Sequence, residues 1–174
     1  MSLRLICRAL LLAVILGVAG CQLTSRSTAI DSPTFVAGRL AITGFSLNPS
    51  FSLEQITSDQ QRLTFSGAFG LGRVDMIFTR GQAVEGIVDG ETLSEEALAT
   101  KLYEATGLSL PLAGLPDWIM GRPFSGVPHQ VIPNGFEQLD WRFQVIEDPV
   151  RGHPTKILAE LGELGVVLGI RSWR

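Results

Sequence analysis

The sequence predicts a mainly β domain of the α+β class, in which a curved antiparallel sheet or part-barrel carries helices at its mouth. Most of the chain after residue 35 consists of short segments that alternate apolar and polar residues and are separated by turn residues. This pattern favours an antiparallel meander over βαβ units. Helical spacing of apolar residues occurs only in the middle of the chain, between about residues 92 and 123.

The first 20 residues have the features of a secretory signal peptide. Arg4 and Arg8 give a positive start, and residues 9–18 form an apolar run that is too short to span a bilayer. The end of this segment, Val18-Ala19-Gly20-Cys21, resembles the lipobox of bacterial lipoproteins. By that resemblance Cys21 becomes the acylated N-terminal residue of the mature chain. The alternative is an ordinary secreted protein in which this cysteine has no such role.

The residue after the lipobox cysteine bears on sorting. It is Gln22 rather than an aspartate, and the resemblance therefore implies sorting to the outer membrane. Several acyl chains would hold the protein there without a transmembrane helix, since each CH₂ contributes about 0.8 kcal/mol.

Charge and cysteine content exclude several classes of function. Cys7 leaves with the signal peptide and Cys21 would be lipidated, so no thiol remains for a disulfide or a metal site. Loss of Arg4 and Arg8 takes the net charge from −3 to −5. An acidic domain of this kind, with only two lysines, is a poor candidate for nucleic-acid binding.

The first half of the mature chain is predicted to be a tether followed by strands. Residues 22–34 are rich in Ser and Thr and have no periodicity, which is typical of a flexible tether between the lipidated residue and a domain covering residues 35–174. Five strands are expected, at residues 36–43, 51–56, 61–65, 73–79 and 83–88.

Two short helices are expected next. Thr92 and Glu95 have the spacing of a capping box, and Gly107 ends a helix whose apolar face contains Leu98, Leu102 and Ala105. The following stretch, residues 108–123, is apolar with helical spacing and is stopped by a glycine and a proline.

The last third is predicted to return to strands. Residues 125–135 form a Pro/Gly-rich connection, and residues 139–145 alternate, with four apolar residues on one face. A loop at 148–154 leads to a closing hairpin of residues 157–161 and 165–173, joined near Gly162.

This arrangement resembles the LolB family. The resemblance is carried first by Leu110-Pro111-Leu112, Leu115, Trp118-Ile119, Gly121 and Pro123. It is supported by Arg62-Leu63 before the loop 67–70, by residues 140–143, and by the final strand ending at Trp173. It covers the chain from about Gly38 onward.

The resemblance implies a half-open antiparallel β-barrel with a helical lid over an apolar cavity. Members of the family accept lipoproteins from the periplasmic carrier LolA and place them in the outer membrane. The implied partners are thus a LolA-type carrier, lipoprotein acyl chains and the outer membrane, on whose periplasmic face the chain would be lipid-anchored. A monomer is expected.

Eight residues are candidates for contact with acyl chains, although each could instead pack in an ordinary core. They are Leu102, Leu112, Leu115, Trp118, Ile119, Trp141, Phe143 and Val145.

The loop 67–72 contains three glycines and two apolar residues, Phe69 and Leu71. A phosphate cradle would need a following helix, whereas a strand follows here. A hairpin tip is therefore expected, and in the LolB family the matching loop protrudes. Phe69 and Leu71 are candidates for a membrane-insertion loop, with Phe69 inserting to help discharge the cargo. The alternative is that both residues fold back onto the sheet.

No pattern of a catalytic site, metal site or cofactor site is present. His129 and His153 are solitary, and there is no Gly-x-Ser-x-Gly motif, so an enzyme is not expected. Two other functions stay open: a lipid-anchored module that binds another hydrophobic ligand, and a structural envelope lipoprotein with a filled core.

Overall fold

The computed structural model of this chain describes residues 33–45, 48–67, 71–80 and 82–174. The predicted signal peptide, Cys21 and nearly all of the predicted tether lie outside the described residues, as does Phe69.

A single antiparallel sheet of eleven strands makes up most of the described chain, with two short α-helices and a 3₁₀ turn in one connection. The elements are β1 (Phe35–Ile42), β2 (Ser50–Gln55), β3 (Gln60–Ser66), β4 (Arg73–Thr79), β5 (Gln82–Val88), β6 (Glu91–Leu93), α2 (Glu95–Thr106), η2 (Leu112–Gly114), α3 (Leu115–Ile119), β7 (Gln130–Ile132), β8 (Gly135–Gln138), β9 (Trp141–Glu147), β10 (Pro154–Leu161) and β11 (Leu164–Trp173). The predicted mainly β class and antiparallel meander are therefore confirmed.

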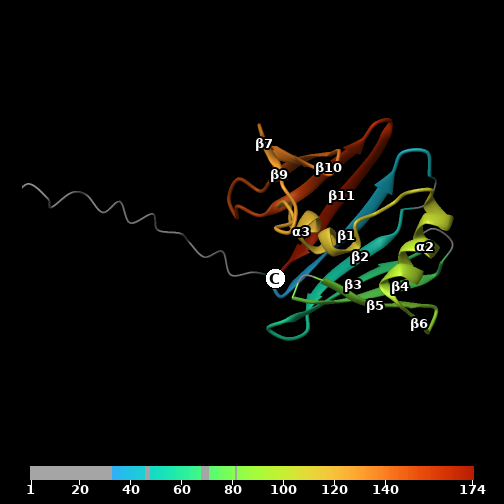
Figure 1. The fold of residues 1–174 in the computed structure, drawn as a ribbon. Coiled ribbons are helices and arrows are strands. Elements are labelled where there is room, and N and C mark those ends of the chain that lie inside the picture. The colour runs from blue at the N-terminus through green and yellow to red at the C-terminus, as the bar shows by residue number, and fades with distance from the viewer. Residues whose placement is uncertain (1–32, 46–47, 68–70, 81) are drawn as a thin grey trace, which may run out of the picture. The chain divides into compact units, whose positions relative to one another are not determined.

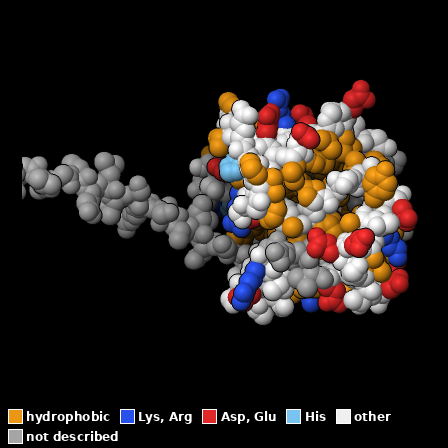
Figure 2. Space-filling view, in the orientation of Figure 1, with side chains coloured by type: hydrophobic (Ala, Val, Ile, Leu, Met, Phe, Trp, Pro, Cys, Tyr) orange, Lys and Arg blue, Asp and Glu red, His pale blue; other side chains and the backbone are white. Residues whose placement is uncertain are grey.

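The strand order is β6-β5-β4-β3-β2-β1-β11-β10-β9-β8-β7. The first and last strands pair in the middle of the sheet, while β6 and β7 lie at its two edges. The sheet is not closed into a barrel. The connection between the two edge strands carries α2, η2 and α3, and Figure 1 shows the sheet bending around α3, with β9 to β11 on one side and β2 to β5 on the other. Apolar side chains surround a hollow in the middle of this face (Figure 2).

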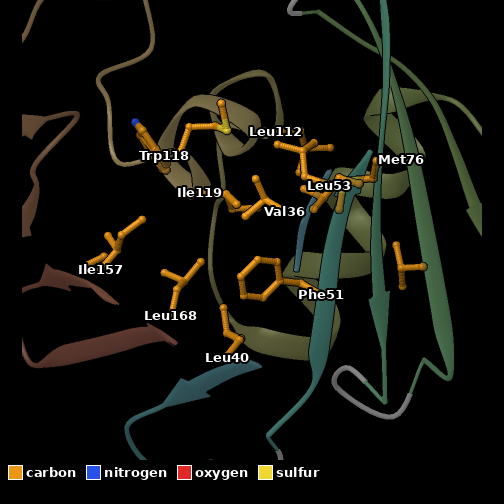
Figure 3. Packing of buried hydrophobic residues seen from close by; sticks show 14 of the residues in the cluster. Val36, Leu40, Phe51, Leu53, Met76, Leu112, Trp118, Ile119, Ile157 and Leu168 are labelled. Atoms are coloured by element: carbon orange, nitrogen blue, oxygen red, sulfur yellow. The ribbon is translucent and has the colours of Figure 1, made fainter. Parts of the chain in front are cut away.

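The hydrophobic core lies between the two halves of the sheet and the helical segments, as Figure 3 shows. In β4 the alternation predicted from the sequence is confirmed, because Val74, Met76 and Phe78 are each at most 1% exposed. Burial of an apolar side chain of this size contributes about 1.5–3 kcal/mol, which is why the strand face is fixed by the sequence pattern.

The N-terminus of α2 differs from the sequence prediction. Thr92 lies in β6, opposite Ile87, and the helix is capped by Ser94, whose Oγ accepts a hydrogen bond from the backbone N–H of Ala97 (3.2 Å). The predicted capping box was wrong because the hairpin turn at Asp89 and Gly90 continues into a further short strand. The predicted end is confirmed: Gly107 adopts φ 71° and its N–H donates to Tyr103.

The segment 108–123 is helical over a shorter stretch than its spacing predicts. Only residues 112–119 are helical, as one 3₁₀ turn followed by one short α-helix. Pro116 has no N–H to donate to the carbonyl of Leu112, so an α-helix cannot run through this point, and the N–H of Leu115 bonds to Leu112 instead.

The predicted connection 125–135 contains strand β7 and the start of β8, neither of which was predicted. The alternation predicted for 139–145 is correct only from Trp141. Leu139 and Asp140 form a two-residue hairpin turn with φ of 52° and 64°, and Leu139 is 43% exposed rather than on the apolar face.

Candidate functional site

An apolar cavity of about 90 Å³ lies on the inner face of the sheet, beneath the segment that contains η2 and α3. All of its lining residues are apolar: Leu40, Ile42, Phe65, Val74, Met76, Leu102, Leu108, Leu110, Leu115, Trp118, Ile119, Trp141, Phe143, Ala159, Val166 and Leu168. A space of this composition offers no hydrogen-bonding partner and fits an apolar ligand.

Six of the eight predicted acyl-contact residues line this cavity, namely Leu102, Leu115, Trp118, Ile119, Trp141 and Phe143. The other two do not. Leu112 is 3% exposed within the core, and Val145 lies beside a separate surface groove near Gly121.

Most of the strand residues that line the cavity were not among the predicted site residues. They are inner-facing residues of β1, β4, β10 and β11, together with Phe65 of β3. The sequence pattern placed Leu40 with Ile42, and Val74 with Met76, on one face of their strands, but an inward position can be core or cavity wall. Only the course of the helical segment distinguishes the two. Leu108 and Leu110, in the same apolar stretch as the candidates Leu112 and Leu115, were also missed.

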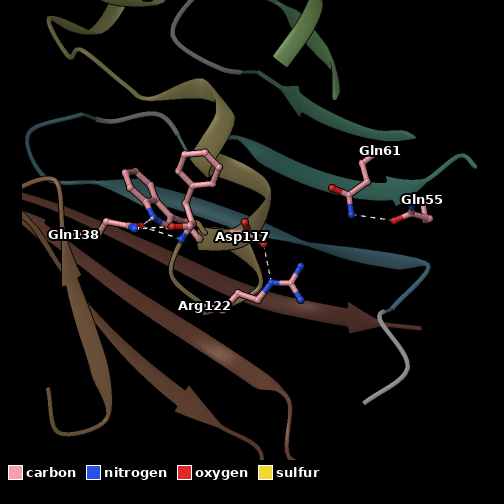
Figure 4. A network of polar contacts seen from close by, with 7 residues as sticks. Gln55, Gln61, Asp117, Arg122 and Gln138 are labelled. Carbon is pink, nitrogen blue, oxygen red and sulfur yellow. Dashed lines mark hydrogen bonds and ion pairs between the residues drawn. The ribbon is translucent and has the colours of Figure 1, made fainter. Parts of the chain in front are cut away.

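Trp118 is the central aromatic residue of the lining. Its ring centroid lies 4.8 Å from that of Phe143 and 6.0 Å from that of Trp141. Both pairs are tilted, which is an arrangement that aromatic rings prefer. Its indole Nε1–H donates to Oε1 of Gln138 at 2.8 Å (Figure 4). The ring is thus fixed by packing on its faces and by a hydrogen bond at its edge.

Gln138 joins this segment to the sheet. Its side-chain amide is buried, with the residue 2% exposed, and it makes four hydrogen bonds. Oε1 accepts from Trp118 and from the backbone N–H of Phe124, while Nε2 donates to the carbonyls of Phe124 and Val127. The end of the segment after α3 is therefore held on β8, whereas Leu108, Leu110 and Leu115 are only half-buried.

A family model described as outer membrane lipoprotein LolB matches residues 35–173. The chain belongs to the LolB family. The resemblance predicted from the mid-chain motif is confirmed by this match, which covers the whole sheet and both helices.

Three curated relatives, each named Outer-membrane lipoprotein LolB, are similar to this member of the LolB family. The protein of Chromobacterium violaceum is 26% identical over 96% of this chain and 98% of its own length. The protein of Halorhodospira halophila is 30% identical over 62% of this chain and 57% of its own. That of Xylella fastidiosa is 34% identical over 41% and 38%, respectively.

Of the two residues predicted for a membrane-insertion loop, the structure of this LolB-family chain describes only Leu71. Phe69 lies outside the described residues. Leu71 is half-buried and packs against the hydrophobic core. The hairpin is closed at its base, where the N–H of Gly67 donates to the carbonyl of Gly72 (2.8 Å).

Charged groups lie outside the cavity. On the outer face of the sheet Asp75 accepts hydrogen bonds from Thr64 and Arg73. Burial raises the pKa of Asp75, but the hydrogen bonds from Arg73 and Thr64 outweigh it and hold that pKa below its usual value.

Within the described residues no three His, Cys, Asp or Glu side chains come together as a metal site would require. His129 is exposed, and the ring of His153 stacks on Trp173. No helix in the described part of this LolB-family chain is both long and apolar enough to cross a membrane.

Proposed function

We propose that this protein is an outer-membrane-anchored receptor. It accepts lipoproteins from a LolA-type periplasmic carrier, holds their acyl chains in the apolar cavity and inserts them into the outer membrane. The observation that carries the proposal is the wholly apolar lining of the cavity in a LolB-family chain. Exposure of an acyl chain to water costs about 0.8 kcal/mol per CH₂, so transfer between carrier and membrane needs such a surface.

The anchor in this proposal is acylated Cys21. Removal of residues 1–20 leaves Cys21 at the N-terminus, and residues 21–34 act as the tether to the folded domain, which functions as a monomer. Several acyl chains make the anchor stable.

The cavity must enlarge to accept an acyl chain, because about 90 Å³ is well below the roughly 300 Å³ of the smallest typical ligand pockets. The half-buried residues before α3 act as the moving lid. Trp118 of α3 and the segment after α3 stay in place, since their displacement would break the four hydrogen bonds of Gln138.

Native mass spectrometry tests the proposed transfer. The mature chain carrying Cys21→Ala, mixed with a LolA-type carrier loaded with lipoprotein, is expected to take up the lipoprotein. Copurification of a different lipid without uptake would favour a module for another hydrophobic ligand. The absence of any ligand would favour a structural lipoprotein with a filled core.

A cavity-filling variant tests where the acyl chain binds. Ala159 is 3% exposed and lines the cavity. Ala159→Leu is expected to lower uptake at least tenfold while the free energy of unfolding falls by no more than about 1 kcal/mol. Ala41→Leu, on the outer face of β1, is the matched control. Equal uptake by the two variants would contradict the proposed site.

Phe69 in this proposal inserts into the membrane and helps discharge the cargo. Phe69→Glu is expected to lower delivery of lipoprotein to liposomes while uptake from the carrier is kept, because a carboxylate is costly to bury among acyl chains. Thr100→Glu, at an exposed position of α2, is the control. Unchanged delivery by Phe69→Glu would exclude this role.

A further inference from the structure

The strand register gives the sheet two distinct ends. Phe35 at the start of β1 exchanges backbone hydrogen bonds with Arg174, so both ends of the domain meet there. In sheet order this end also carries the β2–β3 turn (56–59) and the β9–β10 loop (148–153). The β3–β4 hairpin and the β10–β11 turn lie at the opposite end. In Figure 1 the β9–β10 loop and the C-terminus lie to the left, and the β10–β11 turn lies at the upper right.

The β9–β10 loop holds an apolar residue outward. Val150, at its tip, is 90% exposed, the largest value among the large hydrophobic residues described. The loop is ordered by its own hydrogen bonds. The carboxylate of Asp148 accepts from the N–H groups of Val150 (2.8 Å) and Arg151 (3.0 Å), and Gly152 N–H donates to the carbonyl of Asp148 (2.8 Å).

The base of this loop is attached to the end of the sheet at which the chain begins. The ring of His153 stacks on Trp173, with centroids 5.2 Å apart and 11° between the ring planes. The next residue, Arg174, lies over the ring of Phe35 at 4.8 Å. The base of the loop is therefore held at the end of the sheet where the chain enters β1.

Electrostatic attraction to an anionic surface does not favour this loop, because Glu147 and Asp148 carry two negative charges against the one positive charge of Arg151. Arg151 is exposed, and Glu147 is exposed at the base. The carboxylate of Asp148 is occupied by the two backbone N–H groups, which hold its pKa below the usual value. What the loop offers to a partner is an ordered, uncharged apolar tip.

We propose that the Val150 loop, together with half-exposed Ile56 in the β2–β3 turn at the same end of the sheet, contacts the surface of the bilayer to which the chain is anchored. The inference rests on the lipid anchor of the proposed function. One valine changes a partition equilibrium by only about tenfold, which is too little for a free protein. A tether changes this, because it keeps the loop at an effective concentration near the millimolar range.

Tether length alone does not select the end of the sheet that meets the membrane. The tether, residues 22–34, spans up to about 45 Å when extended, whereas an eight-residue strand is about 26 Å long. Either end can thus reach the bilayer. The Val150 loop selects the end at which the chain joins the sheet, and the opposite end, which includes the β3–β4 hairpin, then faces the periplasm until the domain turns over for delivery.

Depth-dependent fluorescence quenching tests this orientation in the full, lipidated chain. A Ser58→Cys variant, labelled in the β2–β3 turn with an environment-sensitive fluorophore, is reconstituted into phosphatidylethanolamine–phosphatidylglycerol vesicles that contain a headgroup-labelled quencher. A label at Glu163→Cys, in the β10–β11 turn, is the matched control. We expect several-fold stronger quenching at position 58 than at position 163. Val150→Glu should shift the docked-to-undocked ratio about tenfold, whereas Val150→Leu should keep it.

Flotation of the same vesicles distinguishes a failure of the lipid anchor from a failure of the proposed docking. If the protein floats with the vesicles but is quenched equally at both positions, or if Val150→Glu has no effect on quenching, the docking of this end is wrong and the anchor is still supported. Protein that does not float has no anchor, and the docking inference falls with it.

Discussion

At the scale of single residues, Gln138 shows how one polar side chain can be required inside an apolar core. Both lone-pair positions of its oxygen and both of its N–H groups are used, and the partners belong to α3 (Trp118) and to the segment that follows it (Phe124 and Val127). A residue of the same shape without these groups would leave Trp118 Nε1–H and several backbone groups unpaired in a buried place.

Gln138→Leu is therefore expected to lower the free energy of unfolding by about 3 kcal/mol, measured by urea denaturation. Gln144→Leu, at an exposed position of β9, is the control and should change it by less than about 0.5 kcal/mol. A loss of similar size in the two variants would show that the buried hydrogen bonds do not hold this segment.

Asp75 makes stability depend on pH. Its folded-state pKa is lowered, so the carboxylate contributes stability above its unfolded-state pKa of about 4, and this contribution is lost as the pH falls through the lower folded-state value. Asp75→Asn should cost about 1 kcal/mol at pH 7, after allowance for solvent screening, and should weaken the fall in stability between pH 4 and pH 2. Urea denaturation at several pH values measures both effects. Glu163→Gln is the control, and an unchanged pH profile in Asp75→Asn would rule out this contribution.

At the scale of elements, the segment between β6 and β7 is divided by its capping and proline residues. Ser94 begins α2, Gly107 ends it, and Pro116 separates η2 from α3. The residues between Gly107 and η2 are in neither a helix nor a strand, and none of them is fully buried, which leaves them less firmly held than α3. This difference is the basis for the proposed lid.

The corrected helix cap gives a prediction at this scale. Ser94→Ala should lower the free energy of unfolding by about 1 kcal/mol, because the N–H of Ala97 loses its acceptor. Thr92→Ala, at the position the sequence pattern favoured, should cost less than about 0.5 kcal/mol. Thermal unfolding of the two variants measures the difference. A larger cost at Thr92 would support the capping box predicted from the sequence over the Ser94 cap.

At the scale of the whole molecule, the sheet is a meander whose only long connection in the described chain is the one with the helices. The β1–β11 pair closes the two ends of the sequence onto each other, from Val36 opposite Trp173 to Ile42 opposite Val166. This pair has the greatest sequence separation in the sheet, and formation of such contacts slows folding.

A circular permutant tests this topology. Joining residue 174 to residue 33 by a short glycine linker, with new ends at Ser109, makes β11 and β1 neighbours in sequence. The permutant should refold faster in stopped-flow experiments than the unpermuted chain 33–174 carrying the same linker, with a stability within about 2 kcal/mol. Slower refolding, or the loss of a cooperative transition, would contradict the register described for β1 and β11.

Some features of this protein follow from the sequence alone. The alternation in residues 73–79 specified a strand and its buried face, since one inward and one outward residue per pair is a local property of extended backbone. Turn residues placed the closing hairpin, and the residues around Trp118 pointed to the LolB family. The edge strands β6 and β7 were missed because each has only three residues, too few for a periodic signal.

The tertiary structure decided what no local pattern contains. Leu112 and Leu115 have the same chemistry and lie one helical turn apart, yet only Leu115 lines the cavity. Which leucine lines the cavity depends on where Pro116 redirects the segment. It also depends on the hydrogen bond between Trp118 and Gln138, which are 20 residues apart in the sequence. Equally, Val150 is apolar in the sequence like any core residue, and only the hydrogen bonds and ring stacking of its loop hold it outward, beside the point where the domain begins. Hydrophobic burial is non-directional, so the sequence specifies which side chains avoid water and the packed fold specifies where each of them lies.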